Sequence, residues 1–379
     1  MIRLDQHFQV SYQYPVFFSK NIFQKENSVL RDFFVEFGGN DYQKKVFFVI
    51  EKSILENNIQ LKTEIKNYFQ GQDRIHLVEE ILVLEGGEKC KNSELYYRKV
   101  MDAINEHGID RHSFVACIGG GAFLDMVGFG AAIAHRGINL LRFPTTVLSQ
   151  NDSGVGVKNS INFFHKKNFL GTFATPFAVF NDFNFLKSLD KRDQRAGIAE
   201  AIKVSLIKDL AFFEWLEENA EKLLVEDSLM EEQIIRCAKI HMAHIAGGDP
   251  FEKGSARPLD FGHWLAHRIE FLTNYSLRHG EAVAIGIAVD TYYSFLIGRI
   301  KEKEALRVIN TIRKIGFEIH HSVLEEENIN LIFEGLNEFR EHLGGKLTIT
   351  ILNKLGEGIE IHDIKDDSMK KAILKMKEI

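Results

Sequence analysis

The chain has 379 residues, of which 45% are hydrophobic and 26% charged, and its formal net charge is −6. This length predicts two domains rather than a single core, and the acidic balance excludes a general nucleic-acid or anionic-membrane surface. The N-terminus lacks a signal-peptide core, no apolar run reaches membrane-spanning length, and the three cysteines form no CxxC pair. We therefore expect a soluble, cytoplasmic protein.

The first half of the chain alternates predicted strands and helices. Residues 7–20 alternate apolar and polar side chains, which is typical of a strand or of an edge hairpin. The apolar run 45–51 predicts a buried parallel strand, and a helical stretch follows it to Phe69. A helix over 93–107 then precedes a strand over 113–119. This order favours a parallel sheet with helices on its faces.

Three consecutive glycines follow that strand in the stretch GGGAFLD, residues 119–125. Glycines let the backbone approach a ligand closely, and the helix after them offers N–H groups and a positive dipole end to an anion. This is where a doubly wound sheet carries its nucleotide-phosphate loop. The stretch is neither GxGxxG nor a Walker loop, so a tight turn that packs the helix on the sheet is the alternative.

A strand over 140–146 leads into a long segment, residues 148–171, with little regular periodicity. A loop of this length inside a compact domain is usually functional or disordered, and its apolar anchors argue against disorder. Its polar side chains include Asp152, Lys158, Asn162, Lys166, Lys167 and Asn168. A basic loop rich in Asn and Gly suits a phosphorylated substrate, and a solvated surface loop is the alternative.

A last strand of this half, over 177–182, ends the alternation, and the pattern is helical from there almost to the C-terminus. A strand over 346–352 and a charged final helix complete the chain. We therefore expect an α/β domain over residues 1–190 and a mostly helical domain over residues 191–379.

The helix predicted over 195–209 places Glu200 and Lys203 on one face of a run rich in Ala, Ile and Val. An acid and a base that are buried on an apolar helix must be paired or bind something. Glu200 is accordingly a candidate metal ligand. A simple ion pair between Glu200 and Lys203 is the alternative.

Three histidines, His263, His267 and His279, lie close together in the sequence. His263 and His267 stand at i and i+4, so they share one face of a helix. Gly280 breaks the chain after His279, which is therefore expected at a helix start, where it can turn back toward the first pair. Neutral imidazoles are common zinc ligands, and a catalytic site needs a third protein ligand. Hydrogen-bonded histidines at helix ends are the alternative.

Several motifs, taken in order, resemble the sugar phosphate cyclases, the superfamily of 3-dehydroquinate synthase. The motifs read GGGAFLDMVGF, RGINLLRFPTT, NDSGVGVKNSIN, KKNFLGTF, RAGIAEAIK, DFGHWLAH and RHGEAVAIG, and the resemblance as a whole extends from residue 86 to residue 350. The resemblance implies an α/β N-terminal NAD-binding domain with a parallel-type sheet and a mostly α-helical metal-binding C-terminal domain. It also implies a homodimer.

The resemblance also assigns roles to single residues. It implies that zinc, or cobalt, is held by Glu200, His263 and His279. It implies NAD contacts at Glu51, Glu88, Lys91, Gly120, Gly121, Asp125, Thr145 and Thr146. It implies catalytic or substrate contacts at Asp152, Lys158, Lys203, Asp260 and His267, and further phosphate or substrate contacts at Lys167, Asn168 and His342. Arg136 matches an arginine that reaches the substrate phosphate from the partner subunit.

The reaction that the resemblance implies is that of a carbon–oxygen lyase acting on phosphates. NAD would oxidise one hydroxyl of a sugar phosphate, phosphate would then leave by β-elimination, and NADH would return the hydride. Ring opening and an intramolecular aldol step would close the carbocycle. NAD is regenerated in each turnover, so the protein supplies position and electrostatics.

Departures from the dehydroquinate synthase pattern concern the end of the substrate that carries a carboxylate. Two cationic positions of that pattern fall at Met242 and Ala256, although Arg257 is adjacent, and His342 stands near a third. Asp260 replaces an Asn and would repel a carboxylate. These features resemble the 2-epi-5-epi-valiolone synthases and the Ebo-type cyclase homologues, which implies a heptulose 7-phosphate substrate such as sedoheptulose 7-phosphate.

Three other functions stay open from the sequence. 3-Dehydroquinate synthase itself is the first alternative. A polyol dehydrogenase of similar architecture would produce net NADH and would not need Lys158, Lys203 and Arg136. A non-catalytic binding protein would have no reason to retain the expected metal ligands and NAD contacts.

Overall fold

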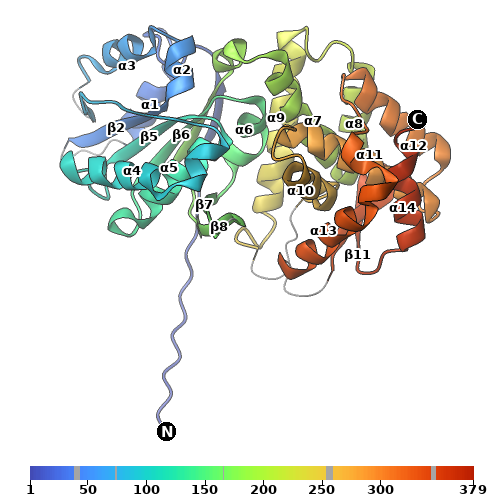
Figure 1. Ribbon diagram of the computed structural model, residues 1–379. Coiled ribbons are helices and arrows are strands. Elements are labelled where there is room, and N and C mark those ends of the chain that lie inside the picture. The colour runs from blue at the N-terminus through green and yellow to red at the C-terminus, as the bar shows by residue number, and fades with distance from the viewer. Residues whose placement is uncertain (38–42, 73–74, 165, 253–258, 343–346) are drawn as a thin grey trace. The chain divides into compact units, whose positions relative to one another are not determined.

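The computed structural model describes residues 1–37, 43–72, 75–164, 166–252, 259–342 and 347–379. The chain forms two compact units (Figure 1). Unit 1 contains Met1–Thr145 and Val157–Asn184, and unit 2 contains Thr146–Gly156 and Phe185–Ile379. The boundary expected at residue 190 would place Thr146–Gly156 in the first domain, but this short segment packs with the helices of unit 2.

Unit 1 is built on a parallel sheet. Among the described residues it has seven strands, in the order β1 (Val16–Ser19), β9 (Ala178–Asp182), β6 (Asn139–Pro144), β5 (Phe114–Gly119), β2 (Lys44–Glu51) and β3 (Ile75–Leu77), with β4 (Leu82–Leu84) also on β2. Each of these pairings is parallel. The predicted parallel sheet is therefore confirmed.

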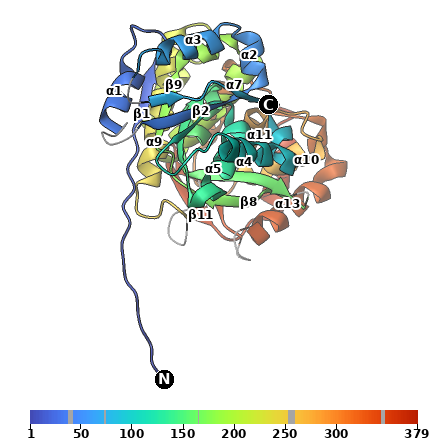
Figure 2. The ribbon, with the colours of Figure 1, turned by 90° about the vertical axis from the view of Figure 1, so that its left-hand side faces the viewer.

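Helices cover both faces of this sheet. On one face, Phe47, Val49 and Cys117 pack in a core with helices α4 (Glu94–Glu106) and α5 (Gly121–Ile133). Because successive strand residues point to opposite faces, Phe48 contacts the other layer, where its ring lies 5.8 Å from that of Phe69. That layer holds α1 (Val29–Phe37), α2 (Lys52–Asn57) and α3 (Leu61–Phe69). Figure 2 shows α1 beside the β1–β9 edge.

Much of the phenylalanine content lies in this second layer. The ring of Phe33 on α1 lies 5.2 Å from that of Phe180 on β9 and 6.2 Å from that of Phe114 on β5. Phe143 on β6 stacks on Phe180 at 5.0 Å. These contacts give the abundant phenylalanines a packing role, since edge and offset ring pairs stabilise a core beyond the area that they bury.

Two sequence expectations for unit 1 are wrong. Only Val16–Ser19 of residues 7–20 is a strand, and it pairs in parallel with β9 instead of forming a hairpin. The segment 148–171 is not an irregular loop, because β7 (Lys158–Phe163) and β8 (Lys166–Phe173) pair as antiparallel strands. Because β7 buries polar side chains, its sequence does not show the alternation of apolar and polar residues that predicts a strand.

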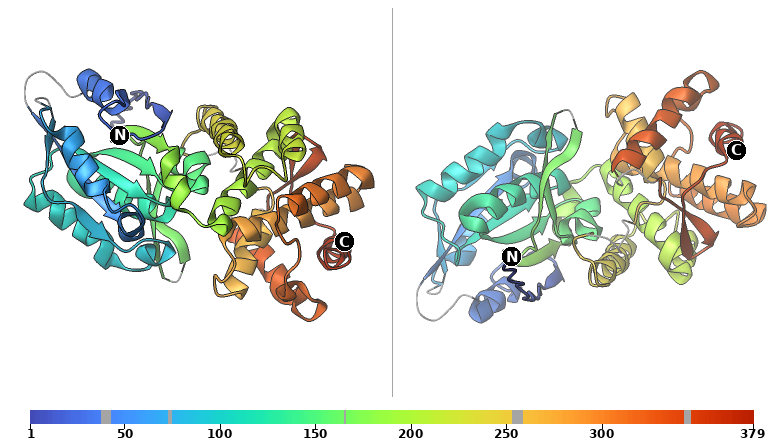
Figure 3. Two further views of the ribbon diagram at one scale, coloured as in Figure 1. Left: turned by 90° about the horizontal axis from the view of Figure 1, so that it is seen from above. Right: turned by 90° about the horizontal axis from the view of Figure 1, so that it is seen from below.

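Unit 2 is mostly helical, as expected (Figure 3). Its longer helices are α7 (Lys191–Lys208), α8 (Leu210–Glu218), α9 (Asp227–Ile245), α10 (His263–Leu272), α11 (His279–Leu296), α12 (Glu302–Lys314), α13 (Ile329–His342) and α14 (Asp366–Lys375). Helix α11 is buried along almost its whole length and packs against α7, α10, α12 and α14. The strands β10 (Ile349–Lys354) and β11 (Glu357–Ile361) form an antiparallel pair. Among the described helices, none has both the length and the apolar character needed to cross a membrane.

Candidate functional site

The carboxyl ends of β2, β5 and β6 bring together the first group of predicted cofactor contacts. Glu51 ends β2, and its Oε2 accepts a hydrogen bond of 2.8 Å from the backbone N–H of Gly120. Gly120 precedes α5, and Gly121 is the first residue of that helix. Thr145 follows β6 and donates its backbone N–H to Gly119 at 3.1 Å. The glycine-rich turn therefore lies where parallel sheets bind nucleotides.

The segment between β4 and η1 also leaves room for the Glu51 carboxylate. A Cβ added at Gly86 would lie 2.0 Å from Glu51 Oε1, so a side chain at that position would displace the carboxylate.

Thr146 has a structural role within unit 2, because its hydroxyl caps the short helix α6 (Val147–Asn151) by accepting from Ser149 N at 3.1 Å. The two adjacent threonines that the sequence reading grouped together thus belong to different units.

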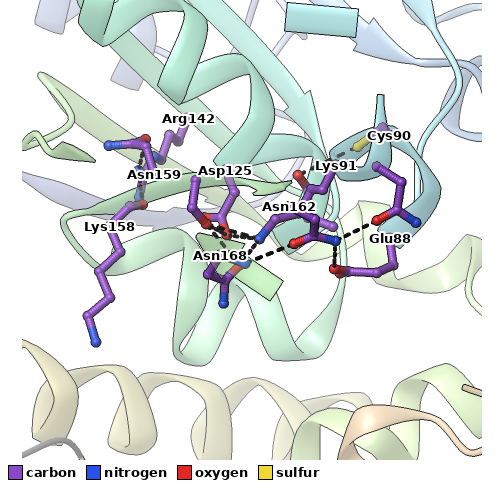
Figure 4. A network of polar contacts seen from close by, with 12 residues as sticks. Glu88, Cys90, Lys91, Asp125, Arg142, Lys158, Asn159, Asn162 and Asn168 are labelled. Atoms are coloured by element: carbon purple, nitrogen blue, oxygen red, sulfur yellow. Dashed lines mark hydrogen bonds and ion pairs between the residues drawn. The ribbon is translucent and has the colours of Figure 1, made fainter. Parts of the chain in front are cut away.

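The buried side chain of Lys91 connects a second group of predicted site residues (Figure 4). Lys91 lies in the 3₁₀ turn η1 (Glu88–Asn92) and is only 3% exposed. Its ammonium contacts Asp125 Oδ2 at 2.8 Å, Ser160 Oγ at 3.1 Å and Asn168 Oδ1. An ammonium has three hydrogens, so these three acceptors use them all. Lys91 is therefore held as a link between α5 and the β7–β8 hairpin.

The hairpin carries the residues predicted to contact phosphate. Lys158 begins β7 and is exposed, and Lys167 on β8 is half-buried. Arg142 on β6 is fully buried and donates to Lys158 O at 3.1 Å and to Asn159 Oδ1 at 2.7 Å, which fixes the start of the hairpin (Figure 4). Arg136 is exposed in η2 (Ala134–Arg136), with a left-handed backbone. Its contact with a partner subunit stays a prediction.

The predicted metal ligands lie together in unit 2. Glu200 comes from α7, His263 is the first residue of α10 and His279 the first residue of α11. Their ligand atoms lie within 4.8 Å of one another. Gly280 allows this approach, since a Cβ there would lie 1.9 Å from Ala196 O, one turn before Glu200 on α7. The absence of a side chain at Gly280 therefore sets how closely α11 approaches α7.

The rings of His263 and His279 are each oriented by a contact that the Nδ1 atom makes with a nearby oxygen. His263 Nδ1 lies 3.3 Å from Phe261 O, and His279 Nδ1 lies 3.3 Å from Glu270 Oε2. Both Nε2 atoms then face Glu200 Oε1, at 3.5 Å and 3.7 Å. This is the arrangement that metal-binding histidines adopt, with a carbonyl or carboxylate holding the other nitrogen.

The charges around Glu200 favour a cation. Burial would raise the pKa of Glu200, but Lys203, His279 and His263 hold it well below its ordinary value. Burial would likewise lower the pKa of His279, yet the carboxylates of Glu200 and Glu270 raise it to about 10. Because this field holds a proton on His279, it would also hold a metal ion in place of that proton.

The donor set fits a metal ion. Glu200 is fully buried, and among the described residues its Oε1 has no hydrogen-bond partner. Two imidazole nitrogens and one carboxylate oxygen form one of the ligand sets found in catalytic zinc sites, which keep a further position open. The ion pair of Glu200 with Lys203, which the sequence left open as the alternative, is present, and metal binding by Glu200 stays a prediction.

Asp152 has a partner that the sequence reading missed. It follows α6, and its Oδ1 lies 3.0 Å from Nδ1 of His241 on α9. His241 is 8% exposed. Burial would lower the pKa of Lys203, but the charges of Glu200 and Asp152 raise it. Asp152, Glu200, Lys203 and His241 therefore form one cluster of ionisable side chains beside the proposed metal site. Cys237 and Ala238 stand one turn before His241 and are buried with it. This apolar neighbourhood was the sequence feature that could have indicated that His241 lies on the buried face of α9.

The turn before α10 is held from two sides. Thr350 Oγ1 on β10 donates to Asp260 Oδ1 at 2.6 Å, and Asp290 on α11 accepts from Trp264 Nε1 at 2.9 Å. Burial raises the pKa of Asp260 to about 6, although the bond from Thr350 lowers it. Asp290 also accepts from the backbone N–H of Gly262, which has a φ of +80°. These contacts fix where His263 begins its helix.

The remaining predicted positions differ in how far they can be placed. His267 is exposed on α10, with its ring centroid 5.6 Å from that of His263 and 6.1 Å from that of His279. His342 ends α13, but its side chain lies outside the described residues, as do Ala256 and Arg257. Glu270 was missed although it stands two helical turns after His263, on the same face.

Comparisons with known proteins find related sequences over most of the chain. The model of the 3-dehydroquinate synthase N-terminal region matches residues 81–196, and that of its C-terminal region matches residues 197–336. The 3-dehydroquinate synthase of Acinetobacter baylyi is 35% identical over 309 residues, which cover 80% of this chain and 84% of that protein. The 3-dehydroquinate synthase of Dictyoglomus thermophilum is 33% identical over 296 residues, covering 78% and 82%.

Solved structures share the whole fold. That of 2-epi-5-epi-valiolone synthase from Streptomyces hygroscopicus subsp. jinggangensis, with NAD⁺ and Zn²⁺ bound, has a TM-score of 0.87 and 26% identity and covers 99% of both chains. 2-Deoxy-scyllo-inosose synthase has the same fold, with a TM-score of 0.77, 21% identity and coverage of 94% and 95%. The expected two-domain fold is thus confirmed, as is the resemblance to the sugar phosphate cyclases. The chain belongs to the 3-dehydroquinate synthase family.

Proposed function

We propose that the protein is an NAD- and metal-dependent sugar phosphate cyclase that converts a heptulose 7-phosphate, such as sedoheptulose 7-phosphate, to a carbocyclic cyclitol and releases phosphate. The observation that carries the proposal is the convergence of Glu200, His263 and His279, with two Nε2 atoms facing one buried carboxylate oxygen. Bound zinc or cobalt would supply Lewis acidity to a substrate hydroxyl, and bound NAD would supply reversible hydride transfer.

The chain's own residues bind, orient and neutralise the substrate. Lys158, Lys167 and Asn168, all on the β7–β8 hairpin, would hold the phosphate group, since cations and amide donors suit its oxygens. Glu51, Glu88, Gly120, Gly121, Asp125 and Thr145 would surround the cofactor. In unit 2, Lys203 would neutralise negative charge beside Glu200, and Asp152 and His267 would contact substrate hydroxyls.

Asp260 supports a substrate that ends in hydroxyls. Its carboxylate is oriented by Thr350 and is largely buried, with a pKa of about 6, so it is mostly ionised at neutral pH. An ionised carboxylate accepts hydrogen bonds from hydroxyls and repels a second carboxylate. Met242 stands where the dehydroquinate synthase pattern has a cationic side chain, and it offers no positive charge to a carboxylated substrate.

3-Dehydroquinate synthase is the second candidate, because relatives with that activity are 35% and 33% identical to this chain. The test is phosphate release by the purified protein with NAD⁺ and zinc, from sedoheptulose 7-phosphate and, in parallel, from the carboxylated substrate of 3-dehydroquinate synthase. Release from the heptulose phosphate alone, without net NADH, is the expected result. Release from the carboxylated sugar alone would refute the substrate proposed here, and net NADH would indicate a polyol dehydrogenase.

We also propose that the working form is a homodimer in which Arg136 reaches the substrate phosphate of the partner subunit. The exposure of Arg136 leaves it available for such a contact. Sedimentation should give twice the chain mass, and Arg136→Ala should raise KM for the sugar phosphate. Full activity in a monomeric preparation would contradict this arrangement.

A further inference from the structure

Asn162 on β7 joins three segments of unit 1 through one amide side chain. Its Nδ2 donates to Glu88 Oε1 at 2.8 Å and to Asn92 Oδ1 at 2.7 Å, both in η1. Its Oδ1 accepts the backbone N–H of Asn168 on β8 at 2.9 Å. The side chain therefore attaches both strands of the hairpin to the turn that carries Glu88 and Lys91 (Figure 4).

The backbone at Asn168 needs such support. Its φ is +56°, a left-handed conformation that is uncommon for residues other than glycine, although Asn tolerates it best. The bond from Asn168 N to Asn162 Oδ1 holds the residue in this conformation from one side. The side chain of Asn168 is held from the other side, where its Oδ1 accepts from Ser160 Oγ at 2.9 Å and from the Lys91 ammonium.

These contacts fix which end of the Asn168 amide can meet a ligand. Lys91 can only donate, so the amide oxygen of Asn168 must face it, and the NH₂ group must point the other way. An NH₂ group presents two donors, and phosphate oxygens need donors. The reverse orientation would present an oxygen that repels phosphate. Lys91 and Asn162 together therefore select the orientation of Asn168 that suits an anion.

We infer that Asn162 is a positioning residue that, with Lys91, presents the Asn168 amide and the hairpin lysines to a phosphate group. The inference deepens the proposed cyclase function and rests on it for the identity of the phosphate ester. Asn162 and Lys91 act through Asn168 and need not touch the substrate. Lys91, which resemblance assigns to NAD, thereby acquires a role on the phosphate side.

The test compares Asn162→Ala with Asn27→Ala. Asn27 is a matched control in the same unit, because it too is half-buried and makes three side-chain hydrogen bonds: its Nδ2 donates to Ser19 Oγ and Lys20 O, and its Oδ1 accepts from Val29 N. Titration calorimetry with inorganic phosphate as the probe gives the dissociation constant without any need for turnover. KM and kcat for the sugar phosphate are measured in parallel.

Asn162→Ala should weaken phosphate binding and raise KM about tenfold or more, which corresponds to one lost charge-assisted hydrogen bond. Asn27→Ala should lower thermal stability similarly but leave both constants within twofold of the wild type. If Asn162→Ala does not fold, Asn162→Ser keeps a polar side chain that is too short to reach Asn168 N and the η1 turn, and it is expected to give the same weakening. Equal phosphate affinity in the Asn162 and Asn27 variants, or no phosphate binding by the wild type, would overturn the inference.

Failure of the proposed function would look different. A wild-type protein that binds phosphate in an Asn162-dependent manner but cyclises none of the sugar phosphates would retain the inferred phosphate site and refute the cyclase proposal. A protein that cyclises its substrate equally well with Asn162→Ala would retain the cyclase proposal and refute the role of Asn162.

Discussion

His279 directs its two ring nitrogens at two different buried carboxylates. Nδ1 lies 3.3 Å from Glu270 Oε2, and Nε2 lies 3.7 Å from Glu200 Oε1. Glu270 comes from the end of α10, and Glu200 from the middle of α7. Because His279 opens α11 between them, the ring is oriented from behind by Glu270 before any metal binds.

Glu270→Gln should therefore weaken metal binding without removing a ligand. A neutral amide holds the imidazole N–H less strongly than a carboxylate does, and such outer partners are worth about 10–100-fold in metal affinity. Competition with a chromogenic chelator would measure the zinc dissociation constant. Glu334→Gln is the control, since Glu334 also pairs with α10, through Arg268 at 2.5 Å, but lies on the surface. Unchanged zinc affinity in Glu270→Gln would show that Glu270 does not orient the ligand.

Lys203→Met should destabilise the metal-free protein strongly. Lys203 is 3% exposed and pairs with fully buried Glu200, so its removal leaves a buried carboxylate without its main positive partner. Breaking such a pair costs about 3–5 kcal/mol. Zinc should recover part of this loss, because the metal supplies positive charge to the same carboxylate.

Urea unfolding with and without zinc would measure both effects for Lys203→Met. Lys208→Met is the control on the same helix, where the side chain is exposed and the expected change is within about 0.5 kcal/mol. A loss of stability that zinc does not reduce would indicate that Glu200 does not bind the metal.

Long periodic elements, and the proximity of the three proposed metal ligands, could be predicted from the sequence. The i, i+4 spacing of His263 and His267 and the glycine after His279 located the starts of α10 and α11. The hairpin β7–β8 could not be predicted, because Ser160 and Asn162 occupy positions where a strand normally places apolar residues. Their hydrogen-bond partners, Lys91 and Glu88, lie about seventy residues earlier in the chain.

The same limit applies to the partners of the site residues. Glu270, His241 and Thr350 act through contacts that join separate helices or a helix and a strand, and spacing within one element does not reveal such contacts. The prediction of a strand over residues 7–15 is wrong for a related reason. Alternation fits a strand only where a partner strand is available, and Phe8, Val10 and Tyr12 are instead exposed.

His241→Asn should lower kcat/KM while leaving metal content unchanged. His241 holds Asp152 by a 3.0 Å contact between Nδ1 and Oδ1, and it is not one of the three proposed ligands. The shorter Asn side chain cannot reach Asp152 in the same way, and a displacement of about 1 Å in a catalytic group can cost about 100-fold in rate. Steady-state kinetics together with zinc analysis would separate the two effects.

His244→Asn is the control for His241→Asn, since it alters a histidine one turn later on the same helix. It should leave kcat/KM near the wild-type value. If both variants lose activity equally, the effect belongs to α9 as a whole and not to the contact with Asp152.

Thr350→Val should shift the acidic limb of the kcat/KM profile to higher pH. Burial raises the pKa of Asp260 to about 6, and the hydrogen bond from Thr350 opposes that rise because it favours the ionised carboxylate. Valine has nearly the shape of threonine but cannot donate, so the pKa of Asp260 rises further. If ionised Asp260 accepts hydrogen bonds from substrate hydroxyls, activity falls as the pH drops through this pKa, and in the variant it falls at a higher pH.

Thr350→Ser retains the hydroxyl and should keep the wild-type profile. Coincident profiles for the Val and Ser variants would mean that ionised Asp260 is not required.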